Sequence, residues 1–217
     1  MIGTVLCSDI EDYANVLRSG PLLGRARKGA LPPSVVGRYL ASIHYLLQYT
    51  PVHLRLAAEL ARARGETPIA EYYEQKFEEE ASHHKWAESD RDVLFSRFGV
   101  EAVQEPAAAM RAMVSTTRAQ IEAAPASYLA YILFAEYFTV ILGPEWVAAL
   151  ERNCGVPSGA LTSVSRHVEL DKHHVAEGRE VIERLASDGT LDDVLRSTLK
   201  ETMTAFSAFC DELCQAA

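Results

Sequence analysis

The sequence predicts an all-α protein, a single-domain bundle of about seven helices. Three observations support this prediction. Apolar residues recur at helical spacing from about residue 34 onward, and no segment alternates apolar and polar residues over the length of a strand. Glycines and prolines fall mostly between these segments, where helices begin and end. At 217 residues and 48% hydrophobic content, the chain can fill one core.

The elements are expected in the following order, with residues 1–217 forming one domain. Residues 1–30 hold a short helical segment and a basic stretch, GPLLGRARKGALPP, which we interpret as an N-terminal arm or lid. Ser34 is the expected N-cap of the next helix, which Pro51 ends. Later helices are expected over residues 52–64, 68–98, 106–123, 127–153, 158–186 and 191–216. Gly143 and Pro144 are expected to bend or break the helix over 127–153.

Composition excludes several classes of partner. The formal net charge of -9 argues against nucleic acid or an anionic membrane surface. We expect no run as long as a membrane-spanning helix, and the first residues lack the basic region of a secretory signal. Four cysteines form no CxxC pattern, and Cys210 and Cys214 are expected to be packed thiols. We therefore expect a cytoplasmic protein with a small-molecule substrate, whose compact helical form is compatible with a homodimer.

The most informative motif is His-x3-Asp-x2-His, formed by His167, Asp171 and His174. No helix breaker lies between residues 163 and 177. At about 100° per residue, steps of three, four and seven return to nearly one face of a helix. Two imidazoles and a carboxylate on one face indicate a site for iron, manganese or zinc. His173 lies away from this face and is expected not to be a ligand.

A second cluster, Glu80-x2-His83, lies in the helical stretch FEEEASHHKWAESD. A histidine three residues after a glutamate shares its face, so the pair indicates a second set of ligands. His84 stands one helical turn after Glu80 and remains an alternative ligand. The neighbouring Glu78 and Glu79 are expected to form a solvated acidic face.

Glu136 stands alone in the apolar run YLAYILFAEYFTVIL. This helix has almost no polar side, so the carboxylate is expected to be buried or to face a cavity. A buried, unpaired charge is very costly, so Glu136 requires a metal, a cation or a proton. A lysine or arginine partner in the core is the alternative to a metal. Aromatic residues near these positions could shape a substrate pocket, namely Tyr73, Phe77, Tyr131 and Phe134.

The same residues resemble the heme-oxygenase-like diiron oxidases, fold relatives of heme oxygenase, thiaminase II and pyrroloquinoline-quinone synthase. In that family one core helix supplies Glu and His, a second supplies Glu, and a third supplies His-x3-Asp-x2-His. The matching positions here are Glu80, His83, Glu136, His167, Asp171 and His174. The run EEEASHHKWAESD is similar to the family's Glu-Glu-x-Gly-His-x-x-Trp region, with Ser82 where Gly is frequent and Asp90 as a following acid that caps or pairs. HYLLQYTPVHLRLAAELA is also similar, and the resemblance spans residues 20–210 or so.

The resemblance implies a heme-oxygenase-like fold, two Fe(II) ions held by these six residues, and O2 as co-substrate. It implies an oxidase or oxygenase of a small carboxylate-bearing metabolite, with no separate protein base. The tyrosines and charges near Glu80 favour an amino acid or derivative, undergoing N-oxygenation, C–C cleavage, desaturation or nitrile formation. The alternative substrate is a fatty acid, decarboxylated to a terminal alkene.

Three other classes of function compete. A hydrolase of the thiaminase II type would need a cysteine nucleophile, which the helices that carry the ligands lack in their interiors. A heme oxygenase would need a proximal histidine, for which His44 is the candidate. A metal-binding bundle without catalytic activity would bind iron without coupling O2 consumption to a substrate.

Overall fold

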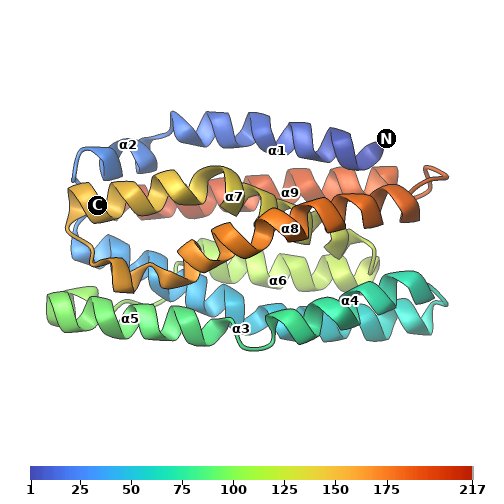
Figure 1. Ribbon diagram of the computed structural model, residues 1–217, viewed down its shortest axis with the longest axis horizontal. Helices are drawn as coiled ribbons and strands as arrows, with labels where there is room; N and C mark the ends of the chain where they lie inside the picture. Colours follow the sequence, from blue (N-terminus) through green and yellow to red (C-terminus); the bar gives the residue numbers. More distant parts are fainter. Residues whose placement is uncertain (217) are drawn as a thin grey trace.

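The computed structural model describes residues 1–216, and within that range every regular element is helical (Figure 1). The α-helices are α1 (Ile2–Arg18), α2 (Pro21–Arg27), α3 (Pro33–Ala63), α4 (Thr67–Glu80), α5 (His84–Phe98), α6 (Ala108–Ala123), α7 (Ser127–Cys154), α8 (Thr162–Leu185) and α9 (Asp192–Gln215). Short 3-10 turns cover Gly99–Ala102 and Ser158–Ala160. The predicted all-α fold class is therefore confirmed.

The helices lie roughly along one long axis (Figure 1). α3 packs against α4, α5 and α6, and α7 packs against α8, α9, α1 and α2. Buried aliphatic and aromatic side chains from all these helices form one continuous core. α8 crosses between α7 and the α4–α5 side of the bundle, which brings together the three parts of the chain that carry the predicted ligands.

Pro51 does not end a helix as predicted, because α3 continues through it as one 31-residue helix. A proline removes one backbone donor, and the long helix tolerates that loss while both of its ends pack against neighbours. The N-cap position of α3 is Pro32 rather than Ser34, which lies in the first turn. α7 likewise runs unbroken through Gly143 and Pro144.

The predicted helix over residues 68–98 is divided into α4 and α5 by a turn at residues 81–83. Glu80 is the last residue of α4, and His83 is the residue immediately before α5. The two are therefore not on one helix, although the amide of His83 still bonds the carbonyl of Glu80 at 3.2 Å. This tight turn keeps the side chains on the same side.

By length and composition alone, α7 could span a membrane. The expectation that the chain has no run of that length was therefore wrong. In this structure its first half lies in the protein core, with Tyr128, Leu133 and Phe134 almost completely buried. A core helix of a helical bundle has the same composition, and such a helix is only weak evidence for a membrane span.

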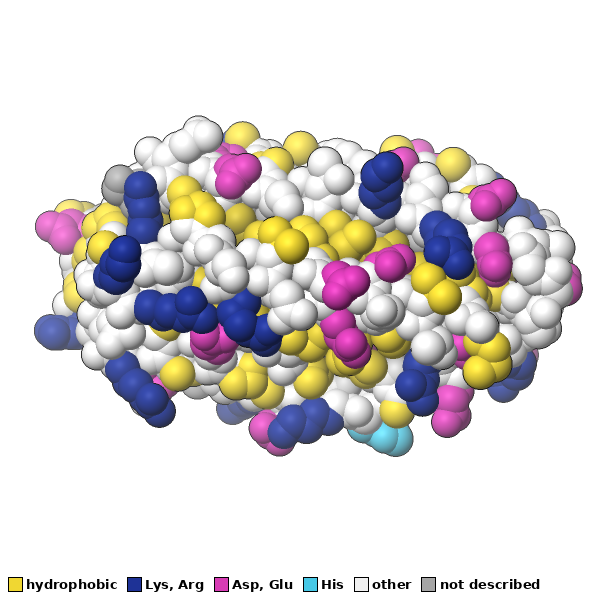
Figure 2. All heavy atoms as spheres, turned by 90° about the horizontal axis from the view of Figure 1, so that it is seen from above, with side chains coloured by type: hydrophobic (Ala, Val, Ile, Leu, Met, Phe, Trp, Pro, Cys, Tyr) yellow, Lys and Arg dark blue, Asp and Glu magenta, His cyan; other side chains and the backbone are white. Residues whose placement is uncertain are grey.

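The first 30 residues form α1 and α2, which lie along α7 and bury Leu6, Ile10 and Leu23. Figure 2 shows the face on which these helices lie: hydrophobic side chains gather in its middle, and acidic and basic groups surround them. The expected N-terminal arm is thus a packed wall of the bundle.

Candidate metal centre

The first candidate group consists of Glu80, His83 and His167, whose possible ligand atoms all lie within 4.8 Å of one another. His83 Nδ1 lies 2.8 Å from Glu80 Oε2, and His167 Nε2 lies 3.9 Å from the same oxygen. All three side chains are buried or nearly so. The end of α4 supplies Glu80, the following turn supplies His83, and α8 supplies His167.

His167 is held in the orientation that a metal ligand needs. Its Nδ1 lies 2.7 Å from the carbonyl oxygen of Ser163, one turn earlier on α8, and therefore acts as the donor. Its Nε2 is buried and has no hydrogen-bond partner. A ligating histidine normally donates from the other ring nitrogen in this way, which leaves a lone pair for the metal.

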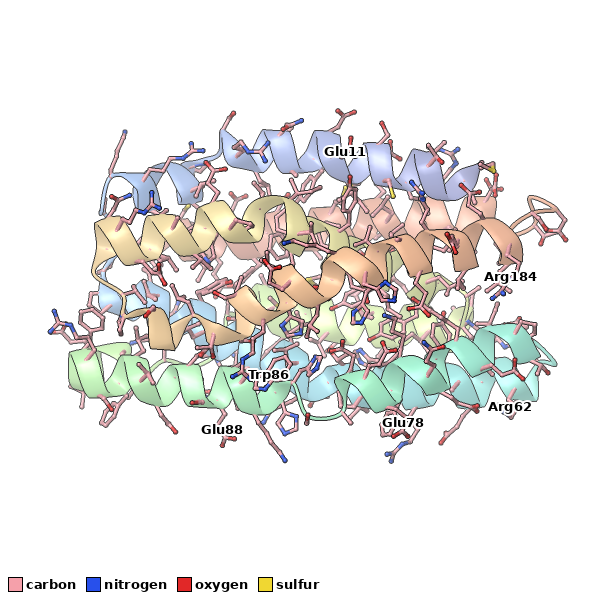
Figure 3. The ribbon with its side chains drawn as sticks, in the orientation of Figure 1. Glu11, Arg62, Glu78, Trp86, Glu88 and Arg184 are labelled. Atoms are coloured by element: carbon pink, nitrogen blue, oxygen red, sulfur yellow. The ribbon has the colours of Figure 1, made fainter. Side chains whose placement is uncertain are left out.

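Trp86 fixes the other histidine of this group. Its ring stacks on His83 with centroids 4.0 Å apart and an interplanar angle of 22°. The Arg166 guanidinium lies 4.9 Å from the centre of the Trp86 ring, and Figure 3 shows Trp86 on the α8 side of α5. His84, the alternative ligand, begins α5 and belongs to neither candidate group.

The second candidate group consists of Glu136 from α7 with Asp171 and His174 from α8. His174 Nδ1 lies 3.3 Å from Asp171 Oδ1 and 3.7 Å from Glu136 Oε1. Glu136 Oε2 is buried without a hydrogen-bond partner. The structure thus brings all six predicted residues into two groups of three, and their role as ligands stays a prediction.

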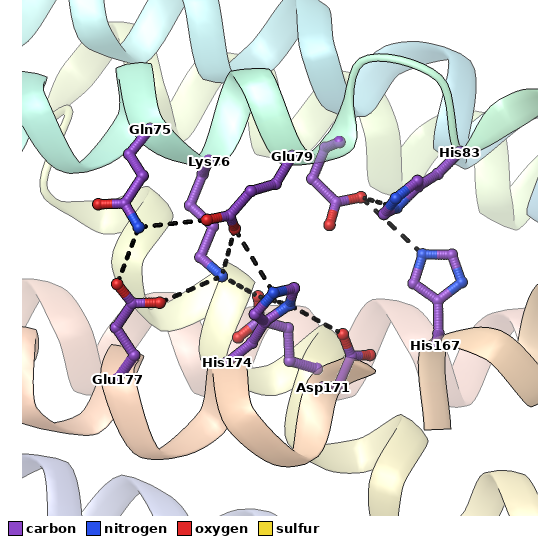
Figure 4. Close-up of polar contacts among 10 residues, drawn as sticks. Gln75, Lys76, Glu79, His83, His167, Asp171, His174 and Glu177 are labelled. Carbon is purple, nitrogen blue, oxygen red and sulfur yellow. Dashed lines mark hydrogen bonds and ion pairs between the residues drawn. The ribbon is translucent and has the colours of Figure 1, made fainter. Parts of the chain in front are cut away.

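Sequence reasoning missed one member of this centre, Lys76. Its side chain is 1% exposed, and Nζ lies 3.1 Å from Glu136 Oε1. Nζ also lies 3.2 Å from Glu79 Oε2 (Figure 4). This is the core partner that the sequence left open for Glu136. Glu79 is not part of a solvated face as expected, because it lies between Lys76 and His174, 3.5 Å from His174 Nε2.

The sequence contains one indication that Lys76 belongs to the centre, which is its spacing from Glu80. Lys76 precedes Glu80 by four residues, so the two share a face of α4. Its neighbours in the sequence, however, are mostly charged or polar, as on an ordinary exposed helix.

Burial and neighbouring charges set the acidity of the carboxylates in opposite directions. Burial raises the pKa of Glu80, but the imidazoles of His167 and His83 more than offset this and bring it to about 2. Burial raises the pKa of Glu136 to about 7, against the lowering effect of Lys76. For Lys76, burial lowers the pKa, and the carboxylates of Glu136 and Glu79 raise it above its ordinary value. Glu80 is therefore ionised at neutral pH, whereas Glu136 needs a neighbouring cation to favour its ionised form.

An apolar cavity of about 240 Å³ adjoins both groups. Four of the predicted ligands border it, as do Leu17 and Pro21 of the N-terminal helices. Most other wall residues are aliphatic or aromatic, including Leu46, Leu54, Ile132, Leu142, Phe138 and Phe206. The interior is therefore suited to an apolar ligand that reaches the metal centre.

Two of the four aromatic residues predicted for the pocket, Tyr131 and Phe134, line this cavity. Tyr73 and Phe77 are not among its wall residues. Tyr73 is fully buried in the core and donates a hydrogen bond of 2.7 Å to the carbonyl of Pro125. Phe77 packs beneath the guanidinium of Arg55, 4.9 Å from its ring centre.

The residues needed by the competing functions are placed differently. The four cysteines are free, and of these Cys210 lines the cavity. Burial raises the pKa of the Cys210 thiol to about 12, so it is not a thiolate nucleophile. His44 is not a wall residue of the cavity, and its Nδ1 lies 3.0 Å from Arg91 Nη1.

No family model and no curated protein sequence matches the chain. A domain of unknown function with a heme oxygenase-like fold from Shewanella denitrificans OS217 superposes with a TM-score of 0.83 at 14% identity, over 98% of this chain and 92% of that chain. A TenA homolog from Pseudomonas syringae pv. tomato str. DC3000 gives 0.68 at 15% identity, over 98% and 92%. The chain therefore has a heme-oxygenase-like fold, as the sequence resemblance implied. Identity this low shows the fold alone.

Proposed function

We propose that this protein is a non-heme diiron oxidase that uses O2 to oxidise a small carboxylate-bearing metabolite. One observation supports the proposal above all others: three acids and three histidines converge from α4 and its following turn, α7 and α8 as two groups of three. Buried acids and imidazoles in such numbers are rarely retained for stability, because each costs desolvation energy.

The donor set fits iron. Each group offers carboxylate and imidazole ligands without thiolate, which suits first-row metals such as iron and manganese. The buried, unpartnered atoms Nε2 of His167 and Oε2 of Glu136 are the atoms that ligation would satisfy. Bound iron would supply the activation of O2, as such cofactors do in other oxidases.

The residues of this chain contribute position and exclusion of water. Ser163 and Trp86 hold the imidazoles of His167 and His83 in the first group. Asp171 contacts His174 in the second group. The apolar wall residues keep the adjoining cavity dry, so that a substrate rather than water meets the oxidant.

The cavity also bears on the substrate. The tyrosines near Glu80 favour an amino acid, but Tyr73 is directed into the core instead. The wall is formed mostly by aliphatic and aromatic side chains, and Lys76 is the one lysine or arginine among its described residues. We therefore favour an acid with an apolar chain or ring, and a fatty acid becomes the second candidate beside an apolar amino acid.

The test is anaerobic Fe(II) titration of the metal-free protein, followed by O2 uptake with panels of apolar amino acids and medium-chain fatty acids. We expect two ions per chain and substrate-dependent O2 consumption. His167→Ala and Glu136→Ala should each lose metal and uptake, whereas the surface control Glu78→Gln should keep both. Iron bound without any substrate-dependent uptake would instead identify a metal-binding bundle without catalytic activity. Binding of no more than trace iron would refute the proposal.

A further inference from the structure

Lys76 is a buried cation that pairs with Glu136 of the second group. It lies one turn before Glu80 on α4, is almost completely buried, and borders the apolar cavity. Its Nζ is 3.1 Å from Glu136 Oε1, 3.2 Å from Glu79 Oε2 and 4.0 Å from Glu177 Oε2. No comparable cation contacts the first group: within residues 1–216, the ion pairs of Glu80 are with His83 and His167 only.

The ammonium group and a metal ion would compete for the same carboxylate. His174 Nδ1 also lies near Glu136 Oε1, at 3.7 Å, on the side where Asp171 lies. An ion bound to this group at about 2.0–2.2 Å from each ligand atom would come within a few ångströms of Nζ. Two positive charges at that separation repel strongly in a buried site, where water screens them poorly.

Two carboxylates other than Glu136, those of Glu79 and Glu177, lie near the Lys76 ammonium group. Its Nζ is held by charge alone, because none of the nearby acceptors is aligned for a hydrogen bond. Glu79 and Glu177 lie farther toward solvent, with side chains 30% and 28% exposed. Figure 4 shows Lys76 between these two carboxylates and His174. Rotation of the long lysine side chain could therefore exchange Glu136 for the two outer partners.

We propose that Lys76 is a built-in competitor of the second metal ion. In the metal-free protein its ammonium group holds Glu136, and the second group binds its ion only when Lys76 moves to Glu79 and Glu177. The first group, which has no such competitor, binds its ion first. This inference rests on the metal centre of the proposed function and adds an order of loading to it.

The experiment is anaerobic titration of metal-free protein with Mn(II), using the EPR signal of free Mn(II) to measure each dissociation constant. The variants are Lys76→Met and Lys76→Gln, which remove the charge, and Lys76→Arg, which keeps it. Gln also retains donors toward the carboxylates, in case Met does not fold. Lys172→Met is the matched control, because Lys172 lies beside Asp171 on α8 but is exposed and pairs with Glu169.

We expect one tight and one weak ion in the natural protein. In both neutral variants the second dissociation constant should fall about tenfold or more, with the first changed less, since partners of metal ligands typically alter affinity by about 10–100-fold. Lys76→Arg and Lys172→Met should leave the second constant weak. A second constant that is unchanged or larger in both neutral variants overturns the role of Lys76 alone. Absence of Mn(II) binding in every protein refutes the metal centre itself.

Discussion

Replacing Glu136 with glutamine should stabilise the metal-free protein at alkaline pH. The unfolded carboxyl has a pKa near 4.5, and burial raises the folded value to about 7. Between these values the folded state binds more protons than the unfolded state, so this group makes stability fall as pH rises. At 1.36 kcal/mol per pKa unit, the free energy of unfolding is lower by about 3 kcal/mol above pH 7 than it is below pH 4.5.

Glutamine is neutral at every pH, so Glu136→Gln removes this loss. Lys76 loses one partner in the variant but keeps Glu79, which reduces the expected gain at pH 8 to between about 1 and 3 kcal/mol. Urea denaturation of metal-free natural protein and variant at pH 5 and pH 8 measures the gain, which should be much smaller at pH 5. Glu78→Gln, at an exposed position, should change stability by less than about 0.5 kcal/mol. An identical difference at the two pH values would refute the reasoning.

Three further substitutions test the packing around the centre. Gly143→Ala places a Cβ 2.6 Å from Val168 Cγ2 and should cost about 1–3 kcal/mol in urea denaturation, which Val168→Ala should partly recover; no recovery would contradict the clash. Asp90→Ala removes the carboxylate that accepts hydrogen bonds of 2.5–3.1 Å at the start of α8, so thermal unfolding should show a loss of about 1–2 kcal/mol. Trp86→Ala removes the ring stacked on His83 and should weaken the first Mn(II) site about tenfold. Unchanged Mn(II) affinity would show that the stacking does not position the ligand.

The helical pattern was sufficient to predict the fold class and to place His167, Asp171 and His174 on one face of α8. That prediction depends only on the pitch of a helix, which tertiary structure does not alter. Lys76 and Glu79 could not be assigned in the same way, because they lie in a charged segment that is buried only by contact with side chains of α7 and α8. Their environment is set by residues more than 50 positions away.

The boundaries of helices were harder to predict for a related reason. Pro51 usually ends a helix, but packing along the whole of α3 compensates for the missing backbone donor. The turn after Glu80 contains neither glycine nor proline, so no residue in the sequence marks it. The helix preferences of single residues are weak compared with the free energy of packing. They determine where a helix ends only where packing favours neither alternative.

The connection between α1 and α2 is a part of this architecture that can change during evolution without altering the candidate metal centre. Gly20 in this turn and Pro21 at the start of α2 border the cavity. The flanks of the turn are tied to α7 by Arg18 and Arg27, which both pair with Glu145. Insertions or deletions in such a turn leave the helices that carry the predicted metal ligands unchanged. Descendants of one ancestor could therefore change the size of molecule they accept by altering this turn alone, while inheriting the same six acids and histidines.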